Sequence, residues 1–366
     1  MNNISTIEVF IANGRVGRLA LTPESLCAFE YDAEWIKSGY SISPFYLPLK
    51  NGLQIAKRDP FHGGFGVFDD SLPDGWGNLI LDRYLTAQGI NSQKLTLLER
   101  LALIGSTGRG ALEFRPDRSV SADDSFVDFD RLATEAQAIL EDKSSAVDEL
   151  YRYGGSSGGA RPKVFATIDN RQWLVKFRAT LDPQNIGETE YQYSLLAKEC
   201  GITMSETRLL NDKYFATERF DRVGQERIHT ISAAGLLNAD YRIPSLDYSL
   251  LLKLTLSLTR DMQQVMQMFR RMVFNIVISN RDDHAKNFSF QYRGGAWKLS
   301  PAYDLLPSTG FNGYHTTTIN GQGEPTKKDV IILAKEIGLQ TNQATQIIQQ
   351  IEDIYHQKRM AKFDLK

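Results

Sequence analysis

The sequence is poor in several features that would define a class of protein. It has two cysteines, Cys27 and Cys200, too few for a disulfide framework or a thiolate zinc site. Its formal net charge is −2 over 366 residues, so overall charge gives no general attraction to nucleic acid or anionic membranes. The N-terminus lacks a basic and then apolar signal pattern, and the most apolar run, residues 250–258, is short and contains Lys253. We therefore expect a cytoplasmic protein with no membrane span.

Glycine-rich segments are present, but the common nucleotide-binding motifs are not. The run Tyr153–Lys163 holds four glycines and two serines directly before a strand predicted at residues 164–168. It has neither the Walker A order nor Gly-x-Gly-x-x-Gly. Backbone N–H groups in such a loop can bind an anion, and a flexible linker would have the same composition. Gly105–Gly110 is a shorter segment of this kind, for which a plain turn is the simpler interpretation.

A polar loop follows the helix that we predict at residues 262–279 from its apolar periodicity. In this loop Asp282 precedes Asn287 by five residues, the spacing that protein kinases use between a catalytic Asp and a metal-binding Asn. His284 and Lys286 lie between them, where they can neutralise phosphate charge or order the loop. A polar helix cap has a similar composition, but the segment that follows favours a chemical site.

Two short strands, predicted at residues 288–292 and 296–299, follow this loop and are joined through Gly294-Gly295. Paired glycines between apolar runs indicate a tight hairpin, which turns the chain back on itself. We therefore expect Asp304 to return close to Asn287. Carboxylate and amide oxygens brought together in this way favour Mg²⁺, which binds one or two protein oxygens beside phosphate and water oxygens.

A lysine stands in an apolar setting in the strand predicted at residues 172–177. Lys176 lies between two apolar neighbours, and an unpaired buried ammonium group is costly, so we expect an anionic partner. Glu190, in the first turn of the helix predicted at residues 188–200, is the candidate within the chain. Protein kinases pair a strand lysine with a helix glutamate to align the nucleotide phosphates. A lysine on an exposed edge strand is the alternative.

The remaining pattern is β-rich early in the chain and largely helical toward its end. Strands are predicted at residues 7–11, 16–21, 206–210 and 214–217, and helices at residues 75–87, 95–104, 129–141, 246–258, 328–337 and 341–357. The connector 218–222 has backbone groups that can hold an adenine edge, with Phe220 against the ring, although a salt-bridged connector would have the same composition. The glycine-rich run 310–325 is predicted to be mobile. This order matches a two-lobed kinase.

Eight segments, in the same order along the chain, closely resemble the HipA family, the serine/threonine kinase toxins of bacterial toxin–antitoxin modules. They are Gly14–Gly17, Phe68–Asp74, Gly105–Leu112, the Gly-Ser-rich loop ending at Lys163, Leu195–Glu199, Glu218–Arg222, Asp283–Ser289 and Tyr303-Asp304. The resemblance implies an α+β, bilobal protein-kinase-like fold of HipA type, with a β-rich N-terminal lobe and an all-helical C-terminal lobe.

The same resemblance implies three domains, two cofactors and two kinds of partner. The domains are residues 1–115 (N-terminal β-rich subdomain), 116–222 (nucleotide-binding part of the N-lobe) and 223–366 (helical C-terminal kinase lobe). The cofactors are ATP and Mg²⁺. The partners are a protein substrate and a HipB-like DNA-binding antitoxin, with nucleic-acid contact only through the antitoxin complex.

Site residues are carried over by position. Asp282 matches the catalytic base, with His284 and Lys286 beside it, and Asn287 and Asp304 match the Mg²⁺ ligands. The nucleotide contacts implied are Ser157, Gly158, Gly159, Ala160, Lys163, Lys176, Glu218 and Phe220. Ser156 falls where family members carry an inhibitory autophosphorylation serine, and a phosphate there would add charge and bulk to a loop that must close on ATP.

The chain departs from the family pattern at positions that bear on these assignments. A well-studied member has glycine at the position of Asp283, so the choice between the adjacent acids rests on the spacing from Asp282 to Asn287. Arg161-Pro162 replaces a Gln-Glu pair in the Gly-Ser-rich loop. The family suggests a translation component as substrate, such as an aminoacyl-tRNA synthetase, and these residues specify none. A small-molecule kinase and a catalytically silent nucleotide-binding scaffold acting with a DNA-binding antitoxin remain the alternatives.

Overall fold

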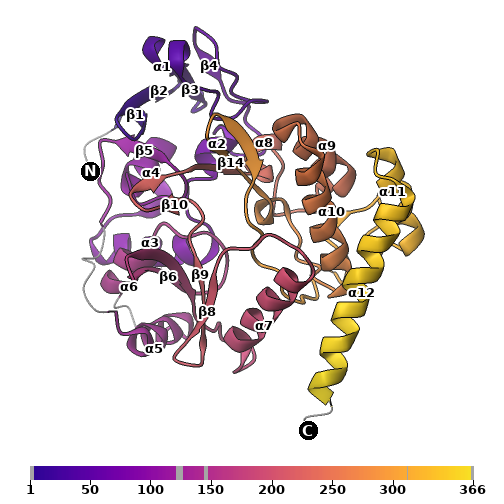
Figure 1. The fold of residues 1–366 in the computed structure, drawn as a ribbon. Helices are drawn as coiled ribbons and strands as arrows, with labels where there is room; N and C mark the ends of the chain where they lie inside the picture. Colours follow the sequence, from indigo (N-terminus) through magenta and orange to yellow (C-terminus); the bar gives the residue numbers. More distant parts are fainter. Residues whose placement is uncertain (1–3, 121–126, 144–146, 311, 364–366) are drawn as a thin grey trace. The chain divides into compact units, whose positions relative to one another are not determined.

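The computed structural model describes residues 4–120, 127–143, 147–310 and 312–363 (Figure 1). The chain divides into two units. The first unit comprises residues 1–188, 208–231 and 235–238, and the second comprises residues 189–207, 232–234 and 239–366. The three-domain division expected from the sequence stays a prediction.

The first unit begins with a five-stranded antiparallel sheet in the order β4-β3-β2-β1-β5 (Figure 1). The strands are β1 (Thr6–Ile11), β2 (Gly14–Leu21), β3 (Cys27–Tyr31), β4 (Gln54–Ile55) and β5 (Leu112–Arg115). Ile7 and Val9 of β1 alternate with more exposed neighbours and are fully buried, as period-two patterning requires. The predicted N-terminal hairpin is confirmed.

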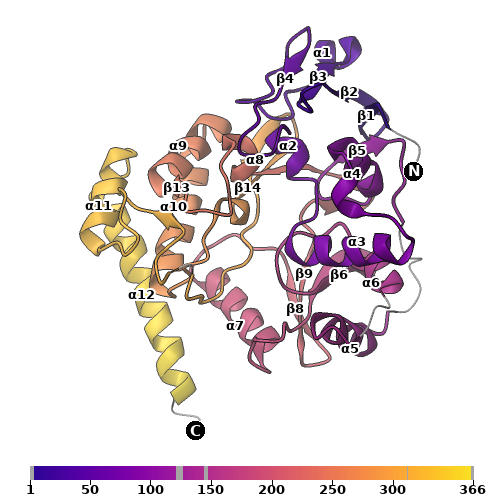
Figure 2. The same ribbon diagram turned by 180° about the vertical axis from the view of Figure 1, so that it is seen from behind.

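A second sheet, in the order β6-β7-β9-β8, packs with three helices in the same unit. The elements are β6 (Lys163–Ile168), β7 (Arg171–Lys176), β8 (Thr207–Leu210), β9 (Tyr214–Glu218), α3 (Gly75–Ala87), α5 (Phe129–Leu140) and α6 (Asp148–Gly154). Trp173 and Val175 of β7 share one core with Trp76 of α3 and Leu150 of α6. Figure 2 shows α3 beside α6, so this core anchors the Gly-Ser-rich loop that follows α6.

Short elements complete the first unit. They are α1 (Ala33–Ser38), α2 (Gly66–Asp69), η1 (Ser92–Lys94), α4 (Leu97–Ile104), β10 (Arg222–Val223) and β11 (Glu226–Arg227), with β12 (His229–Ser232) and α8 (Ala233–Leu237) crossing into the second unit. α4 begins with a capping box, in which the Thr96 hydroxyl accepts from the Glu99 N–H and the Glu99 carboxylate accepts from the Thr96 N–H. The sequence did not predict α1, α6 or α8.

The second unit contains helices and several short strands. They are most of α7 (Ile186–Glu199), β13 (Leu246–Asp247), α9 (Tyr248–Thr259), α10 (Met262–Val277), η2 (Ala285–Asn287), β14 (Ser289–Arg293), β15 (Ala296–Leu299), β16 (Thr317–Thr318), α11 (Lys327–Glu336) and α12 (Thr341–Phe363). α10 packs against both α9 and α12 (Figure 2). The expectation of an all-helical C-terminal lobe is wrong, because β14 and β15 form an antiparallel hairpin and β13 pairs with β16.

The helix α10 positions the loop that follows it. The Asp261 carboxylate accepts a hydrogen bond from the Gln263 N–H and so caps the first turn. Val265, Met268 and Met272 recur at helical spacing and are buried, which fixes the helix by its apolar face. The backbone then leaves the helix at Ser279, which has a left-handed φ of 57°.

None of the helices within the described ranges combines the length and the apolar composition that crossing a membrane would require.

His229 is a buried titratable group whose protonation should weaken the first unit. It is 1% exposed, and its Nε2 lies 2.9 Å from the Ile42 carbonyl oxygen, to which a neutral ring can donate. Burial lowers the pKa of His229 to about 4, whereas histidine in an unfolded chain titrates near 6.5. Between these values the unfolded chain binds the extra proton. Stability present above about pH 6.5 is therefore lost as the pH falls toward 4.

Acidification should destabilise the wild type more than His229→Gln, which keeps a donor and cannot titrate. From about pH 7 to about pH 4.5 we expect the difference in the free energy of unfolding between the two proteins to change by on the order of 3 kcal/mol. Thermal unfolding of both proteins across this range measures the effect. Parallel pH profiles would show that His229 does not titrate as described.

Candidate active site

The loop after α10 brings Asp282 and Asn287 together. The Asn287 Nδ2 donates a 2.7 Å hydrogen bond to the Asp282 carbonyl oxygen, while the Asp282 side chain is exposed. The His284 Nδ1 accepts from the Lys286 N–H at 3.2 Å, so the histidine orders the turn that leads into η2. The five-residue spacing read from the sequence thus corresponds to one closed loop.

The β14–β15 hairpin returns the chain as predicted. Phe290 pairs with Leu299, and the turn residues Gly294 and Gly295 have left-handed φ values of 62° and 78°, which glycine adopts without strain. Beyond β15, the Tyr303 hydroxyl donates to the Lys286 carbonyl oxygen at 2.6 Å. This bond joins the residue before Asp304 to the residue before Asn287.

The donor atoms of Asn287 and Asp304 suit a hard divalent cation. Because the Asn287 Nδ2 is hydrogen bonded to the Asp282 carbonyl, its amide oxygen is the atom left to face a cation. Asp304 has a left-handed φ of 54°, and the Asn280 Nδ2 holds its carbonyl oxygen at 3.0 Å. Among the described residues no group of three or more His, Cys, Asp or Glu side chains is placed to hold a metal ion, so a site here would use amide and carboxylate oxygens.

Asp283 is placed very differently from its neighbour Asp282. It is 0% exposed, and its Oδ2 lies 2.8 Å from the Tyr248 hydroxyl and 2.9 Å from His315 Nδ1. Its Oδ1 accepts from the Thr317 N–H at 3.1 Å. Burial and the adjacent Asp283 carboxylate raise the pKa of Tyr248 well above its usual value. The Asp283 side chain is therefore enclosed by protein donors.

These contacts also correct the prediction of a mobile run at residues 310–325. His315, Thr316 and Thr317 are buried, and the Thr316 N–H donates to the Arg281 carbonyl oxygen at 3.1 Å. The centre of the run is thus bound to the loop that carries Asp282. Glycine content predicted mobility because the partner of this segment lies elsewhere in the sequence.

Lys286 and His284 lie around one aromatic ring. The Lys286 Nζ sits 4.0 Å from the centroid of the Tyr241 ring, and the His284 ring centroid is 6.2 Å from it. A cation over an aromatic face is held there by the ring quadrupole. This contact holds the Lys286 ammonium group against the Tyr241 ring beside the loop.

The Gly-Ser-rich loop lies against the start of α3. The Gly159 N–H donates to the Asp74 carboxylate, and the Gly159 carbonyl oxygen accepts from the Trp76 N–H at 3.0 Å. The approach is close, because a Cβ on Gly77 would lie only 2.2 Å from the Ser157 carbonyl oxygen. One backbone amide predicted to bind phosphate is therefore bound to a protein carboxylate in this conformation.

The two ends of this loop are also held by its own side chains. The Ser157 hydroxyl donates to the Gly154 carbonyl oxygen at 2.6 Å, and Ser157 is 2% exposed. Lys163 is buried, and its ammonium group donates to the Gly158 carbonyl oxygen. Lys163 and Gly158, both expected to contact nucleotide, thus contact each other.

The other predicted nucleotide contacts lie on the second sheet and after it. Lys176 pairs with Lys163 across β6 and β7, and its Nζ is 5.6 Å from the centroid of the Phe215 ring. Glu218 ends β9 and is 3.5 Å from Arg171, and Arg109 lies over the Phe220 ring at 5.8 Å. The pairing of Lys176 with Glu190 stays a prediction, as does the meeting of these groups with Asp282 around one nucleotide.

Gly105–Gly110 is a turn held by charged side chains. The Arg222 guanidinium donates to the carbonyl oxygens of Gly108 at 2.9 Å and Gly110 at 2.8 Å. The Gly110 N–H donates to the Asp221 carboxylate at 2.7 Å. Carbonyl oxygens facing a guanidinium do not form an anion cradle, so the plain-turn interpretation describes this segment.

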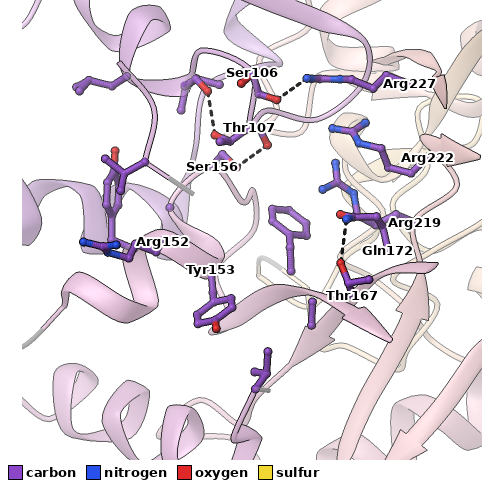
Figure 3. Close-up of a pocket in the computed structure, with 18 of the residues that line it drawn as sticks. Ser106, Thr107, Arg152, Tyr153, Ser156, Thr167, Gln172, Arg219, Arg222 and Arg227 are labelled. Atoms are coloured by element: carbon purple, nitrogen blue, oxygen red, sulfur yellow. Dashed lines mark hydrogen bonds between the residues drawn. The ribbon is translucent and has the colours of Figure 1, made fainter. Parts of the chain in front are cut away.

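A cavity of about 400 Å³ opens beside Ser156 in the first unit (Figure 3). The Ser156 hydroxyl donates to the Thr107 carbonyl oxygen at 3.0 Å at its edge. The lining includes four arginines, Arg152, Arg219, Arg222 and Arg227, and the described lining residues include no Asp or Glu. Arg219 and Arg222 are paired with Asp221, and Arg227 is paired with Glu113. The cavity next to the serine expected to be phosphorylated is therefore lined by guanidinium groups, most of which already have a carboxylate partner.

Sequence reasoning missed several residues that hold the candidate site. They are Asp74, Tyr248, Asn275, Asn280 and His315. Asp74 ends the segment Phe68–Asp74 named in the sequence analysis, but nothing in the local pattern indicated its contact with Gly159. Asn275 and Tyr248 are polar residues within apolar helical patterns, and that exception was the available signal for them. Asn280 lies in the polar loop and His315 in the glycine-rich run, where nothing local set them apart.

Comparisons with known proteins identify the family. Residues 7–115 match the HipA N-terminal domain and residues 155–358 match the HipA-like C-terminal domain. "Putative kinase Y4dM" of Sinorhizobium fredii is 24% identical over 297 residues, covering 73% of this chain and 71% of that protein. A "Putative kinase" of Haemophilus influenzae is 27% identical over 222 residues, covering 48% of this chain and 65% of that protein.

A solved structure shares the fold. It is HipA of Shewanella oneidensis, determined as a toxin–antitoxin complex with HipB and operator DNA. The TM-score is 0.70 at 18% identity, over 94% of this chain and 88% of that one. Both domain matches and this shared fold agree with the motif order in the sequence, and the chain belongs to the HipA family.

Proposed function

We propose that this protein is a kinase toxin that uses ATP and Mg²⁺ to phosphorylate serine or threonine on a cellular protein. It acts in the cytoplasm with a HipB-like DNA-binding antitoxin, through which it reaches DNA, and it phosphorylates itself at Ser156. The kinase names of its relatives and the fold shared with a HipA solved beside HipB and operator DNA support this proposal. The substrate class follows the family, in which an aminoacyl-tRNA synthetase is the type to test first.

The observation that carries the proposal is the hydrogen bond from the Asn287 amide to the Asp282 carbonyl oxygen. It closes a loop that presents an exposed carboxylate at one end and an amide oxygen at the other. The bond from Tyr303 to the Lys286 carbonyl oxygen adds the segment of Asp304 to the same loop. Protein kinases need these three groups for phosphoryl transfer.

In this proposal Asp282 is the general base. Its carboxylate accepts the proton of the substrate hydroxyl as that oxygen bonds to the γ-phosphorus, and the bond from phosphorus to the departing ADP oxygen breaks. Asn287 and Asp304 hold Mg²⁺, which when bound offsets the negative charge of the phosphates. His284 orders the loop and Lys286 contributes positive charge beside it.

The first unit binds the nucleotide in this proposal. Lys176 contacts the phosphates, the backbone of Ser157 to Ala160 closes over them with Lys163, and Glu218 and Phe220 contact the adenine. Binding phosphate through the Gly159 amide requires the loop to leave the Asp74 carboxylate, so the described conformation is one in which the loop is turned away from that role.

Labelled ATP tests the proposal directly. The purified protein is incubated with Mg²⁺ and γ-labelled ATP, alone and with cell lysate, beside the Asp282→Asn variant. We expect label on the protein itself or on a lysate protein, and far less with the variant. Label found only in a small molecule would contradict the proposal and indicate a small-molecule kinase. Bound nucleotide without any phosphoryl transfer would contradict it and indicate a nucleotide-binding scaffold.

Ser156→Ala should abolish self-phosphorylation and leave phosphorylation of a substrate protein intact. A phosphate on Ser156 would face the arginines of the adjacent cavity, where charge-assisted hydrogen bonds would hold the loop away from ATP (Figure 3). Intact mass of wild type and variant after incubation with ATP measures the modification. Ser157→Ala is the control, because that buried hydroxyl is bound to Gly154 and the variant should still gain phosphate.

A further inference from the structure

Four buried polar side chains in the second unit form a continuous hydrogen-bonded line from Asp283 to the backbone carbonyl oxygen of Asp304. The Tyr248 hydroxyl donates to Asp283 Oδ2 at 2.8 Å and accepts from Asn275 Nδ2 at 3.0 Å. Asn275 Oδ1 accepts from Asn280 Nδ2 at 3.0 Å. The same Asn280 Nδ2 donates to the Asp304 carbonyl oxygen at 3.0 Å. We name these five residues the buried chain.

The donors and acceptors of the buried chain can be arranged in only one way. A carboxylate can only accept, so the single Tyr248 proton points to Asp283 and the tyrosine oxygen must accept from Asn275. That fixes the Asn275 amide with its oxygen toward Asn280, which in turn uses its nitrogen for both remaining bonds. The hydrogen bond from Tyr248 to Asp283 thereby determines the orientation of a group that holds the Asp304 backbone.

Burying the polar groups of this chain costs more free energy than filling the same core with apolar residues. Tyr248 and Asp283 are 0% exposed, and Asn275 and Asn280 are 2% exposed. Polar groups buried this deeply weaken a fold unless every partner is present, whereas apolar residues would fill the same space at lower risk. Such networks specify one arrangement, and this one begins beside Asp282 and ends at Asp304.

His315 and Thr317 hold the other side of the same carboxylate. Asp283 thus receives donors from α9 and from the segment after Asp304, and it cannot move without breaking several buried bonds. Its neighbour Asp282 is exposed on the adjoining peptide, so the backbone of the proposed base is fixed by the buried residue next to it.

We propose that the buried chain fixes the positions of Asp282 and Asp304 relative to each other, with Tyr248 as its central positioning residue. This inference rests on the proposed kinase function for its catalytic consequence. Breaking the chain should leave the fold in place but let the base and the cation-holding segment move independently. A misplacement of about 1 Å can cost roughly 100-fold in rate.

Tyr248→Phe removes only the hydroxyl and so cuts the chain at its centre. We expect kcat to fall roughly 10- to 100-fold and the Mg²⁺ concentration for half-maximal activity to rise severalfold. Hydrogen exchange should accelerate in both residues 281–287 and residues 303–306. Thr255→Val is the matched control: Thr255 is on the same helix and 0% exposed, and its hydroxyl bonds only to the Leu251 carbonyl oxygen among the interactions described. It should lower stability without moving the Mg²⁺ midpoint.

The two proposals fail in different ways. A wild type with no phosphoryl transfer removes the kinase proposal, while the exchange measurement still tests the buried chain. Wild-type exchange in both segments of Tyr248→Phe, or an unchanged Mg²⁺ midpoint and kcat in an active protein, overturns the positioning role. Should Tyr248→Phe not fold, Asn275→Ala breaks the next link and is measured against the same control.

Discussion

Asp282→Asn should lower phosphoryl transfer by about 10²- to 10⁴-fold, the usual scale for loss of a general base. The amide has the same shape as the carboxylate but cannot take the proton from a substrate hydroxyl. Asp282 is exposed, whereas Asp283 is enclosed by buried hydrogen-bond donors, so we expect the substitution to leave the fold in place. Initial rates of labelled phosphate transfer and thermal unfolding of both proteins measure the loss and show that the fold persists.

The matched control is Asp353→Asn on α12, an exposed acid of the same unit that accepts a hydrogen bond from Gln349 at 2.8 Å. It should transfer phosphate at the wild-type rate. Undiminished transfer by Asp282→Asn would remove this residue from its role. Since Asp283 is enclosed by Tyr248, His315 and Thr317, the base would then have to be sought outside this pair.

Local patterns predicted the elements whose signals lie within a short stretch of sequence. Helix α3 begins and ends where the apolar periodicity placed it, and the paired glycines at 294 and 295 gave the β14–β15 hairpin. The spacing from Asp282 to Asn287 likewise depends only on six consecutive residues, which one closed loop brings together.

Contacts between distant residues could not be predicted in this way. The helices α1, α6 and α8 have at most seven residues, too few for the apolar spacing to repeat over several turns. The run at residues 310–325 looked mobile because its composition does not reveal that His315 and Thr317 are bound to Asp283. Tyr248, in a helix predicted from its leucines, gave no local sign that its hydroxyl would bind an acid in the loop after α10.

Asp221, in the segment Glu218–Arg222, is buried between two arginines, and its loss should have the largest effect on stability. Asp221 is 4% exposed, and it accepts from Arg219 at 2.8 Å, Arg222 at 3.0 Å and the Gly110 N–H at 2.7 Å. Burial acts to raise the pKa of Asp221, but the charges of Arg219 and Arg222 outweigh it and hold the pKa far below the ordinary range. Burial also lowers the pKa of Arg222 to about 9, and the Asp221 carboxylate acts against this by stabilising the charged guanidinium.

Asp221→Ala should therefore cost about 3–5 kcal/mol, because it leaves two buried guanidinium groups without their carboxylate. Asp221→Asn keeps the shape and the Gly110 contact but loses the charge, so it should fall between wild type and alanine. Glu34→Ala, which breaks an exposed 2.7 Å ion pair with Lys37 in the same unit, should cost less than about 1 kcal/mol. Urea unfolding of the four proteins measures the series. Equal stability of Asp221→Ala and Glu34→Ala would mean that water or a rearranged loop replaces the carboxylate, and that Arg222 does not depend on Asp221 to hold the Gly105–Gly110 turn.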